Sequence, residues 1–229
     1  MTIRLCAIIP CFDAATTVGE VVAATLAQVE RVIVVDDGSS DGGAGLAAAA
    51  GAEVVRHATN LGKGAALRSG LERARQEGFS HVVTLDADGQ HLAGEIAILG
   101  TAARRHPRSI VLGIRARGDD RDIAARNRFG NAFADWWVGL AAGLRLADSQ
   151  SGFRIYPIAE TLALDATAER FAWESEILIL AGRRGLPVLQ REVETWYPPA
   201  ALRRSHYEPW RDTVAIIATV VPWLCGLKR

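Results

Sequence analysis

The sequence contains few cysteines and no excess of charge of one sign. Its three cysteines, Cys6, Cys11 and Cys225, are spread over 229 residues. This odd number at wide spacing forms neither a metal-binding pattern nor a disulfide framework, and it favours a reducing compartment. Lys and Arg together number 26, as do Asp and Glu, so the formal net charge is zero. No overall basic field therefore argues for binding to nucleic acid.

Signatures of several other protein classes are also missing. Met1 leads directly into a strand-like segment, so we expect no signal peptide and predict a cytoplasmic location. The apolar tail 213–227 contains Pro222 and is shorter than the ~20 residues that a membrane-spanning helix needs. No Gly-x-Gly-x-x-Gly follows the first apolar run, which argues against a dinucleotide-binding Rossmann domain. Gly62-Lys63-Gly64 lacks the spacing and the Lys-Ser/Thr pair of an ATP-hydrolysing loop.

The hydrophobic residues, 49% of the chain, alternate between strand-like and helical patterns. Short β-branched runs separated by helical segments are typical of a parallel sheet that is covered by helices. The pattern predicts strands at 5–10, 31–35, 53–56, 82–85, 109–113 and 186–196, and helices at about 17–29, 65–76, 127–144, 173–182 and 211–222. The fold class predicted is therefore α/β, with a mostly parallel sheet and a C-terminal apolar helix.

Acidic side chains follow two of the predicted strands. Asp36-Asp37-Gly38-Ser39 follows the second strand, and Asp86-Ala87-Asp88 follows the fourth. Ligands of open α/β sheets bind beyond the carboxyl ends of the strands. Paired carboxylates suit Mg²⁺ or Mn²⁺ that keeps positions open for substrate phosphates. Each segment is equally compatible with an ordinary solvated turn, since Asp, Ser and Gly are common turn residues.

Taken in order, these segments resemble the family 2 glycosyltransferases of GT-A fold. The resemblance covers about residues 3–198, and a later segment is similar to the branch of polyprenyl-phosphate and dolichyl-phosphate sugar transferases. The matching segments are Ile9-Pro10-Cys11-Phe12-Asp13, 35–41, 60–64, 86–91 and, for that branch, 148–154. Ala14 stands where the family usually has an acidic residue, and Ala93 stands where a proline is common.

The resemblance implies roles for individual residues of this chain. Asp88, Arg115 and Asp148 are expected at the reaction centre, with Asp88 and Gln90 holding Mg²⁺ or Mn²⁺ and Arg115 clamping a phosphate. The expected nucleotide-binding residues are Pro10, Phe12, Asp13, Asp36, Asp37, Gly62, Lys63, Asp86 and Ala87. The expected acceptor-binding residues are Arg126, Arg128, Ser151, Arg203, Arg204 and His206.

The predicted reaction is an inverting, metal-dependent transfer of a hexose or similar sugar from a UDP- or GDP-linked donor to a lipid, with polyprenyl phosphate as the first choice. A phosphate acceptor needs no general base, whereas a hydroxyl acceptor does, and Asp148, Glu174 and Glu176 are the candidates for one. A hydroxyl acceptor, a sugar nucleotidyltransferase, and a non-catalytic nucleotide-sugar-binding or membrane-scaffolding module remain alternatives. The sequence does not decide the sugar, the base, the metal or the oligomeric state.

The C-terminal segment predicts attachment to a membrane surface. We divide the chain into a GT-A domain, 1–200, and an acceptor loop with an interfacial helix, 201–229. Trp210 and Trp223 bracket the apolar tail, and Trp136 and Trp137 lie on a second candidate interfacial helix. We therefore expect a peripheral protein on the cytoplasmic face of the membrane. Packing of both segments on the core, or a dimer contact, is the alternative.

Overall fold

The computed structural model describes residues 3–115, 125–196 and 209–225, although the side chains of 125–132 and 209–213 are not described. Within these ranges one sheet of seven strands runs in the order β3-β2-β1-β4-β6-β5-β7. The strands are β1 (Leu5–Cys11), β2 (Val32–Asp36), β3 (Glu53–Arg56), β4 (His81–Thr84), β5 (Ile110–Arg115), β6 (Arg154–Pro157) and β7 (Val188–Val193). The predicted α/β class with a mostly parallel sheet is confirmed, because β6 alone among these strands pairs antiparallel, with β4 and β5.

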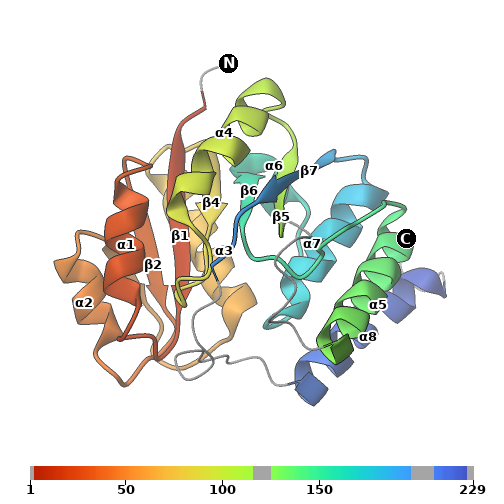
Figure 1. The fold of residues 1–229 in the computed structure, drawn as a ribbon, viewed down its shortest axis with the longest axis horizontal. Coiled ribbons are helices and arrows are strands. Elements are labelled where there is room, and N and C mark those ends of the chain that lie inside the picture. The colour runs from red at the N-terminus through yellow and green to blue at the C-terminus, as the bar shows by residue number, and fades with distance from the viewer. Residues whose placement is uncertain (1–2, 116–124, 197–208, 226–229) are drawn as a thin grey trace.

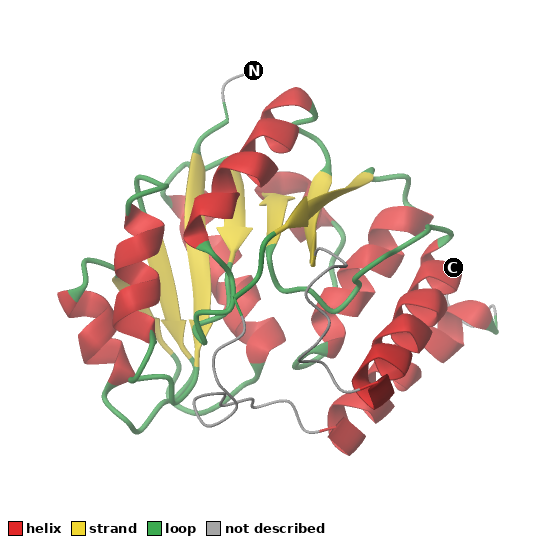
Figure 2. Cartoon of the chain, in the orientation of Figure 1, coloured by secondary structure: helices red, strands yellow, loops and turns green. Residues whose placement is uncertain are grey.

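Helices cover both faces of this sheet (Figures 1 and 2). They are α1 (Val18–Leu26), α2 (Gly43–Ala49), α3 (Lys63–Gln76), the short 3₁₀ helix η1 (Ala93–Glu95), α4 (Ile96–Arg105), α5 (Ala125–Ala142), α6 (Ile158–Ala163), α7 (Ala172–Arg183) and α8 (Pro209–Leu224). Successive side chains of a strand point to opposite faces, so β1 contributes to two cores. Ala7 and Ile9 pack in the core that includes α1 and α4, whereas Cys6 and Ile8 pack in the core that includes α3 and α7.

The fourth strand begins and ends one residue earlier than the sequence pattern indicated. It ends at Thr84, so Asp86 and Asp88 lie in the turn beyond it and not on an extended strand. Gly89 takes a φ of 77°, which glycine adopts without the steric cost that a Cβ adds. The turn therefore delivers the two carboxylates from irregular backbone at the carboxyl end of the sheet.

The C-terminal helix α8 packs against α5 and α7, at the right of Figure 1. It continues through Pro222 to Leu224, whereas we expected it to end at the proline. Ile216, Val220 and Trp223 enter the same core as α7, and Trp223 is only 7% exposed. The expectation that Trp223 faces a membrane is therefore wrong, because its side chain fills the space between helices. No helix among the described residues is both long and apolar enough to cross a bilayer.

Candidate active site

A cavity of about 290 Å³ opens at the carboxyl ends of β1, β2 and β4. Its walls come from the segments that follow these strands, from the start of α3 and from the turn before α7. The lining residues are Pro10, Cys11, Phe12, Asp13, Ala14, Thr16, Thr17, Asp37, Asn60, Gly62, Lys63, Ala66, Asp86, Ala87, Asp88, Arg170 and Phe171. Eight of the nine residues expected to bind a nucleotide lie in this lining, together with Asp88.

The ninth residue, Asp36, lies elsewhere. It is fully buried, and its carboxylate accepts hydrogen bonds from the Ser39 backbone N–H (3.0 Å) and from Arg56 Nε (2.9 Å). Asp37 does reach the cavity, where it also organises the chain. It accepts from the backbone N–H groups of Leu61 (2.9 Å) and Gly62 (2.7 Å) and pairs with the ring of His57. The two adjacent aspartates therefore differ: Asp36 holds its own turn, and Asp37 joins the β2 end to the loop before α3.

Lys63 joins two carboxylates at the cavity. Its Nζ lies 2.7 Å from Asp86 Oδ1 and 3.0 Å from Glu174 Oε2. Burial by itself raises the pKa of Asp86, but the charge of Lys63, helped by His91, lowers it to about 2. Burial by itself lowers the pKa of Lys63, and the two carboxylates reverse this effect and raise it. Asp86 is thus an anion already paired to a lysine.

Asp88, in contrast to Asp86, is held by Gln90. Its two oxygens accept hydrogen bonds from the Gln90 backbone N–H (3.0 Å) and from Gln90 Nε2 (2.8 Å). Burial, and then the neighbouring charge of Asp86, raise the pKa of Asp88, so a cation beside it would be stabilising. His91 supports the same turn, because its Nδ1 accepts from the Asp86 backbone N–H (3.1 Å) and its ring stacks on Phe153.

This donor set fits a divalent cation that is completed by substrate. Among the described side chains, no group of three or more His, Cys, Asp or Glu could hold a metal by itself. Mg²⁺ usually binds one or two protein carboxylates and takes its other oxygens from phosphates and water. Because Gln90 Nε2 points to Asp88, the amide oxygen of Gln90 remains as a second hard donor.

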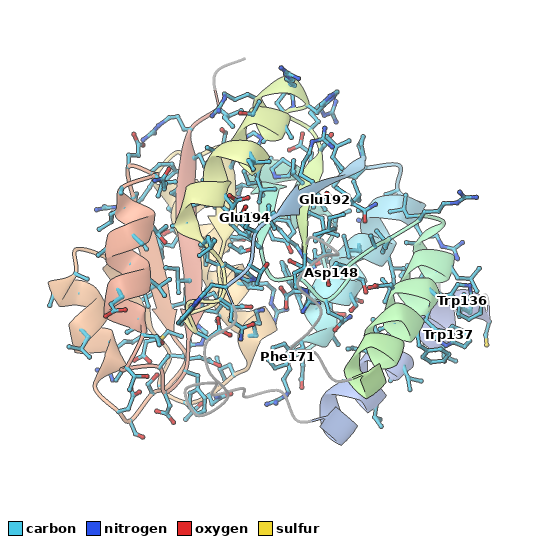
Figure 3. The ribbon with its side chains drawn as sticks, in the orientation of Figure 1. Trp136, Trp137, Asp148, Phe171, Glu192 and Glu194 are labelled. Carbon is cyan, nitrogen blue, oxygen red and sulfur yellow. The ribbon has the colours of Figure 1, made fainter. Side chains whose placement is uncertain are left out.

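Arg115, at the end of β5, and Asp148, before β6, form a bidentate ion pair. Arg115 Nε lies 2.7 Å from Asp148 Oδ2, and Arg115 Nη2 lies 2.7 Å from Asp148 Oδ1. Figure 3 shows Asp148 between the sheet and α5, in the interior of the molecule. The two residues predicted for the reaction centre are therefore brought together, but here each engages the other. Neither belongs to the lining of the cavity.

The segment after Asp148 is fixed by a buried cation. Arg154 is fully buried and donates to the backbone carbonyls of Ser149 (2.8 Å), Ser151 (2.7 Å) and Glu174 (2.8 Å). Ser151, expected to bind the acceptor, is buried, and its hydroxyl oxygen accepts from the Phe153 N–H (3.3 Å). Arg154 thus fixes the segment through its backbone carbonyl groups, and Gly152 within the segment lies close to the Lys63–Asp86 pair.

Each candidate for a general base has a structural partner. Asp148 binds Arg115, and Glu174 binds Lys63. Glu176 accepts from the backbone N–H groups of Thr167 (2.7 Å) and Ala168 (2.6 Å). The remaining acceptor candidates, Arg126, Arg128, Arg203, Arg204 and His206, lie outside the described side chains.

Thr17, Arg170 and Phe171 line the cavity, although the sequence did not indicate them for the site. The Thr17 hydroxyl donates to the Ala87 carbonyl (2.6 Å), and this hydrogen bond ties the start of α1 to the turn that carries Asp86 and Asp88. Arg170 and Phe171 reach the cavity from the turn before α7, more than 80 residues beyond Asp88, and Phe171 is labelled in Figure 3. Only folding brings such distant segments together.

Comparison with known proteins agrees with this geometry. A family model described as glycosyl transferase family 2 matches residues 6–150. An uncharacterized protein of Methanocaldococcus jannaschii is 28% identical over 86% of this chain and 84% of its own length. UDP-N-acetylglucosamine--dolichyl-phosphate N-acetylglucosaminyltransferase of Methanococcus voltae is 28% identical over 66% of this chain, which spans 62% of that relative.

Among solved structures, glucosyl-3-phosphoglycerate synthase from Mycobacterium tuberculosis superposes with a TM-score of 0.67. It is 20% identical, and the match covers 98% of this chain and 79% of that one. That crystal contains Mn²⁺, UDP and glucosyl-3-phosphoglycerate. At this level of identity the superposition establishes the shared fold.

Proposed function

The chain belongs to glycosyl transferase family 2, and from this premise we propose that it transfers a sugar from a nucleotide-sugar donor to a polyprenyl-phosphate acceptor at a membrane surface. The observation that carries the donor half is the convergence of eight predicted nucleotide-binding residues and Asp88 on one cavity. Four separate segments of the chain supply these residues, so their convergence does not follow from any single motif. The proposed reaction is a single displacement that inverts the anomeric centre.

The cavity residues divide the work of donor binding. Asp88 and the Gln90 amide oxygen would hold Mg²⁺ or Mn²⁺, which would neutralise charge on the departing nucleoside diphosphate. Asp37 and Asp13 present acceptors toward the nucleoside, and Phe12 provides an apolar surface. Lys63 keeps Asp86 ionised and in place. A nucleotidyltransferase would instead need basic side chains near the first strand, and 10–18 contains none.

A phosphate acceptor agrees best with the carboxylates. An ionised phosphate is itself the nucleophile, so no side chain must remove a proton from it. Asp148, Glu174 and Glu176 are all occupied by partners that a general base would have to leave. The Methanococcus voltae relative is named for transfer to dolichyl phosphate, whereas the mycobacterial neighbour was crystallised with glucosyl-3-phosphoglycerate. The relative extends farther than this chain, so its acceptor is a guide for the proposal.

Exposed apolar side chains on α5 and α8 support the proposal that the protein binds to a membrane surface. Phe133, Trp136 and Leu140 lie at helical spacing on α5, and Trp136 is 58% exposed. On α8, which packs against α5, Val214, Ile217 and Val221 are exposed in the same way. We call these six residues the outer apolar face; Figure 3 labels Trp136 at the edge of the molecule. Apolar side chains with an interfacial Trp suit partial burial in lipid head groups. We propose the cytoplasmic leaflet as the surface that this face contacts.

A donor and acceptor screen tests this function. The protein is incubated with UDP- or GDP-linked sugars and Mg²⁺ or Mn²⁺, with and without a polyprenyl phosphate. The release of the nucleoside diphosphate is measured. The proposal expects release that requires both the metal and the lipid phosphate. Release driven by 3-phosphoglycerate or by a sugar hydroxyl would move the acceptor to another class. Release of pyrophosphate would indicate nucleotidyl transfer, and binding without any turnover would indicate a non-catalytic module.

A further inference from the structure

Arg170 occupies a backbone conformation that arginine rarely takes. Its φ is 51°, in the left-handed region where a Cβ meets the backbone. Among the described residues, the other non-glycine residues with positive φ are Asp13 and Asp165. Aspartate is enriched in this region, whereas a long cationic side chain there calls for an explanation. Such outliers concentrate at functional sites, where the surrounding fold maintains them.

The surrounding fold does maintain Arg170. A Cβ added to Gly62 would lie 2.8 Å from Arg170 Cγ, and one added to Gly64 would lie 3.1 Å from the Arg170 carbonyl oxygen and 2.6 Å from Trp173 Cβ. The two glycines around Lys63 thus admit the turn before α7 to the start of α3. This close approach accounts for the Gly62-Lys63-Gly64 pattern without a nucleotide-hydrolysing loop, and it holds Arg170 in the cavity wall.

The acidic lining of the cavity indicates a role for the positive charge of Arg170. Four carboxylates line the cavity, those of Asp13, Asp37, Asp86 and Asp88. Among the described lining residues the cations are Lys63 and Arg170, and Lys63 already lies between Asp86 and Glu174. A phosphorylated substrate entering this acidic cavity needs positive charge beyond a divalent metal. A guanidinium offers several donors in a planar fork that matches phosphate oxygens.

We propose that Arg170 binds a phosphate group of a substrate in this cavity. The inference rests on the proposed function, because it assigns a residue of that site to phosphorylated ligands. The phosphate has two possible sources, the diphosphate of the donor and the monoester of the acceptor. The strained conformation keeps Arg170 in the wall of the cavity that Asp86 and Asp88 also line.

The test compares two glycine substitutions in the same segment. Arg170→Gly removes the cation and leaves a residue that adopts positive φ freely. Asp165→Gly makes the same backbone change at φ 52° on an exposed residue outside the cavity lining. Both variants and the wild type are titrated calorimetrically with UDP and with GDP in Mn²⁺, and with farnesyl monophosphate in detergent. Thermal unfolding is recorded for each.

We expect Arg170→Gly to lower the affinity for one of these phosphate ligands by about ten- to a hundredfold, which is the effect of losing a charge-assisted hydrogen bond. Its unfolding temperature should stay close to that of Asp165→Gly, which should bind like the wild type. Arg170→Lys should recover part of the affinity, which a purely structural role would not require. A loss confined to the nucleotides assigns Arg170 to the donor, and a loss confined to farnesyl monophosphate assigns it to the acceptor.

Unchanged affinity for all three ligands in folded Arg170→Gly overturns the inference and leaves the proposed function standing. If the wild type binds none of them, the proposed function fails and the inference fails with it. Should Arg170→Gly not fold, Arg170→Met retains the aliphatic stem that faces Gly62 and gives the same comparison. Equal affinity of Arg170→Met and the wild type would then also overturn the inference.

Discussion

Arg115 and Asp148 form a two-pronged ion pair, with N–O distances of 2.7 Å on both prongs, that joins the end of β5 to the segment before β6. The Arg115 backbone N–H adds a third hydrogen bond to Asp148 Oδ2 (3.2 Å). The Asp148 side chain is almost entirely buried, and Arg115 is the cation that contacts it. The pair was expected to serve substrate phosphate and catalysis; its geometry gives it a structural role as well.

Breaking this pair from one side should destabilise the fold. Arg115→Gln leaves the buried Asp148 carboxylate without its cation and should lower the free energy of unfolding by about 3 kcal/mol. Urea unfolding of Arg115→Gln, Asp148→Asn and the double variant measures the coupling. The double variant should lose less than the sum of the single variants. Additive losses would show that the two side chains do not depend on each other.

Asp88→Asn should abolish transfer and sharply weaken metal-dependent binding of the nucleotide sugar. An amide replaces a charged ligand of a hard cation poorly. Binding is measured with Mn²⁺ and with excess chelator, and Asp165→Asn serves as a control, since it changes an exposed aspartate outside the cavity lining. Wild-type turnover in chelator would contradict the metal requirement.

If the acceptor is a phosphate, no carboxylate outside the donor site should act as an essential base. Asp148→Asn, Glu174→Gln and Glu176→Gln should each retain measurable transfer per folded molecule. Glu176→Gln should still cost about 1–3 kcal/mol of stability, because Glu176 accepts two backbone N–H bonds at the turn before α7. A ~10²–10⁴-fold loss of rate in one folded variant, typical of a missing general base, would instead favour a hydroxyl acceptor.

Gly152→Ala should disturb the Lys63–Asp86 pair without changing any charge. An added Cβ would lie 2.8 Å from both Asp86 Oδ2 and Lys63 Nζ. Moving these groups should cost about 1–3 kcal/mol, the usual range for overpacking, and weaken nucleotide binding. Gly94→Ala is the matched control, because a Cβ there meets nothing within 4 Å. Equal nucleotide affinity in the two variants would argue that the pair does not shape the cavity.

The outer apolar face should determine binding to liposomes. Trp136→Gln with Ile217→Gln should reduce co-sedimentation with anionic liposomes by about tenfold or more, since each exposed apolar side chain contributes on the order of 1.5–3 kcal/mol when buried. Substitution is preferable to removing α8, whose inner face is part of the core.

Leu46→Gln provides the control for this face, because Leu46 is comparably exposed but lies on α2. Failure of the wild-type chain to sediment would reject the membrane proposal. A concentration-dependent dimer that Trp136→Gln dissolves would assign the face to a second copy of the chain.

The sequence by itself determined the layered α/β fold and most of the donor site. Apolar runs of period two and helices of period 3.6 are local patterns, and acidic residues directly after Val35 and Leu85 must lie at the strand ends. The cavity at those ends therefore follows from local spacing together with the rule for open sheets. The division of the chain at residue 200 and the roles of 203–206 stay predictions.

Only the tertiary structure decided how individual side chains are used. Asp36 and Asp37 are adjacent and are the same residue type. Asp36 is nevertheless buried and accepts a hydrogen bond from Arg56, whereas Asp37 lines the cavity. The sequence alone favours a membrane interface for Trp223, but the packing of α8 against α5 and α7 buries its side chain in the core. Arg170 belongs to no motif, and only the fold places it in the cavity lining. Partners such as Arg115 and Asp148 lie 33 residues apart, so their contact depends on the packing of whole elements, which no local pattern encodes.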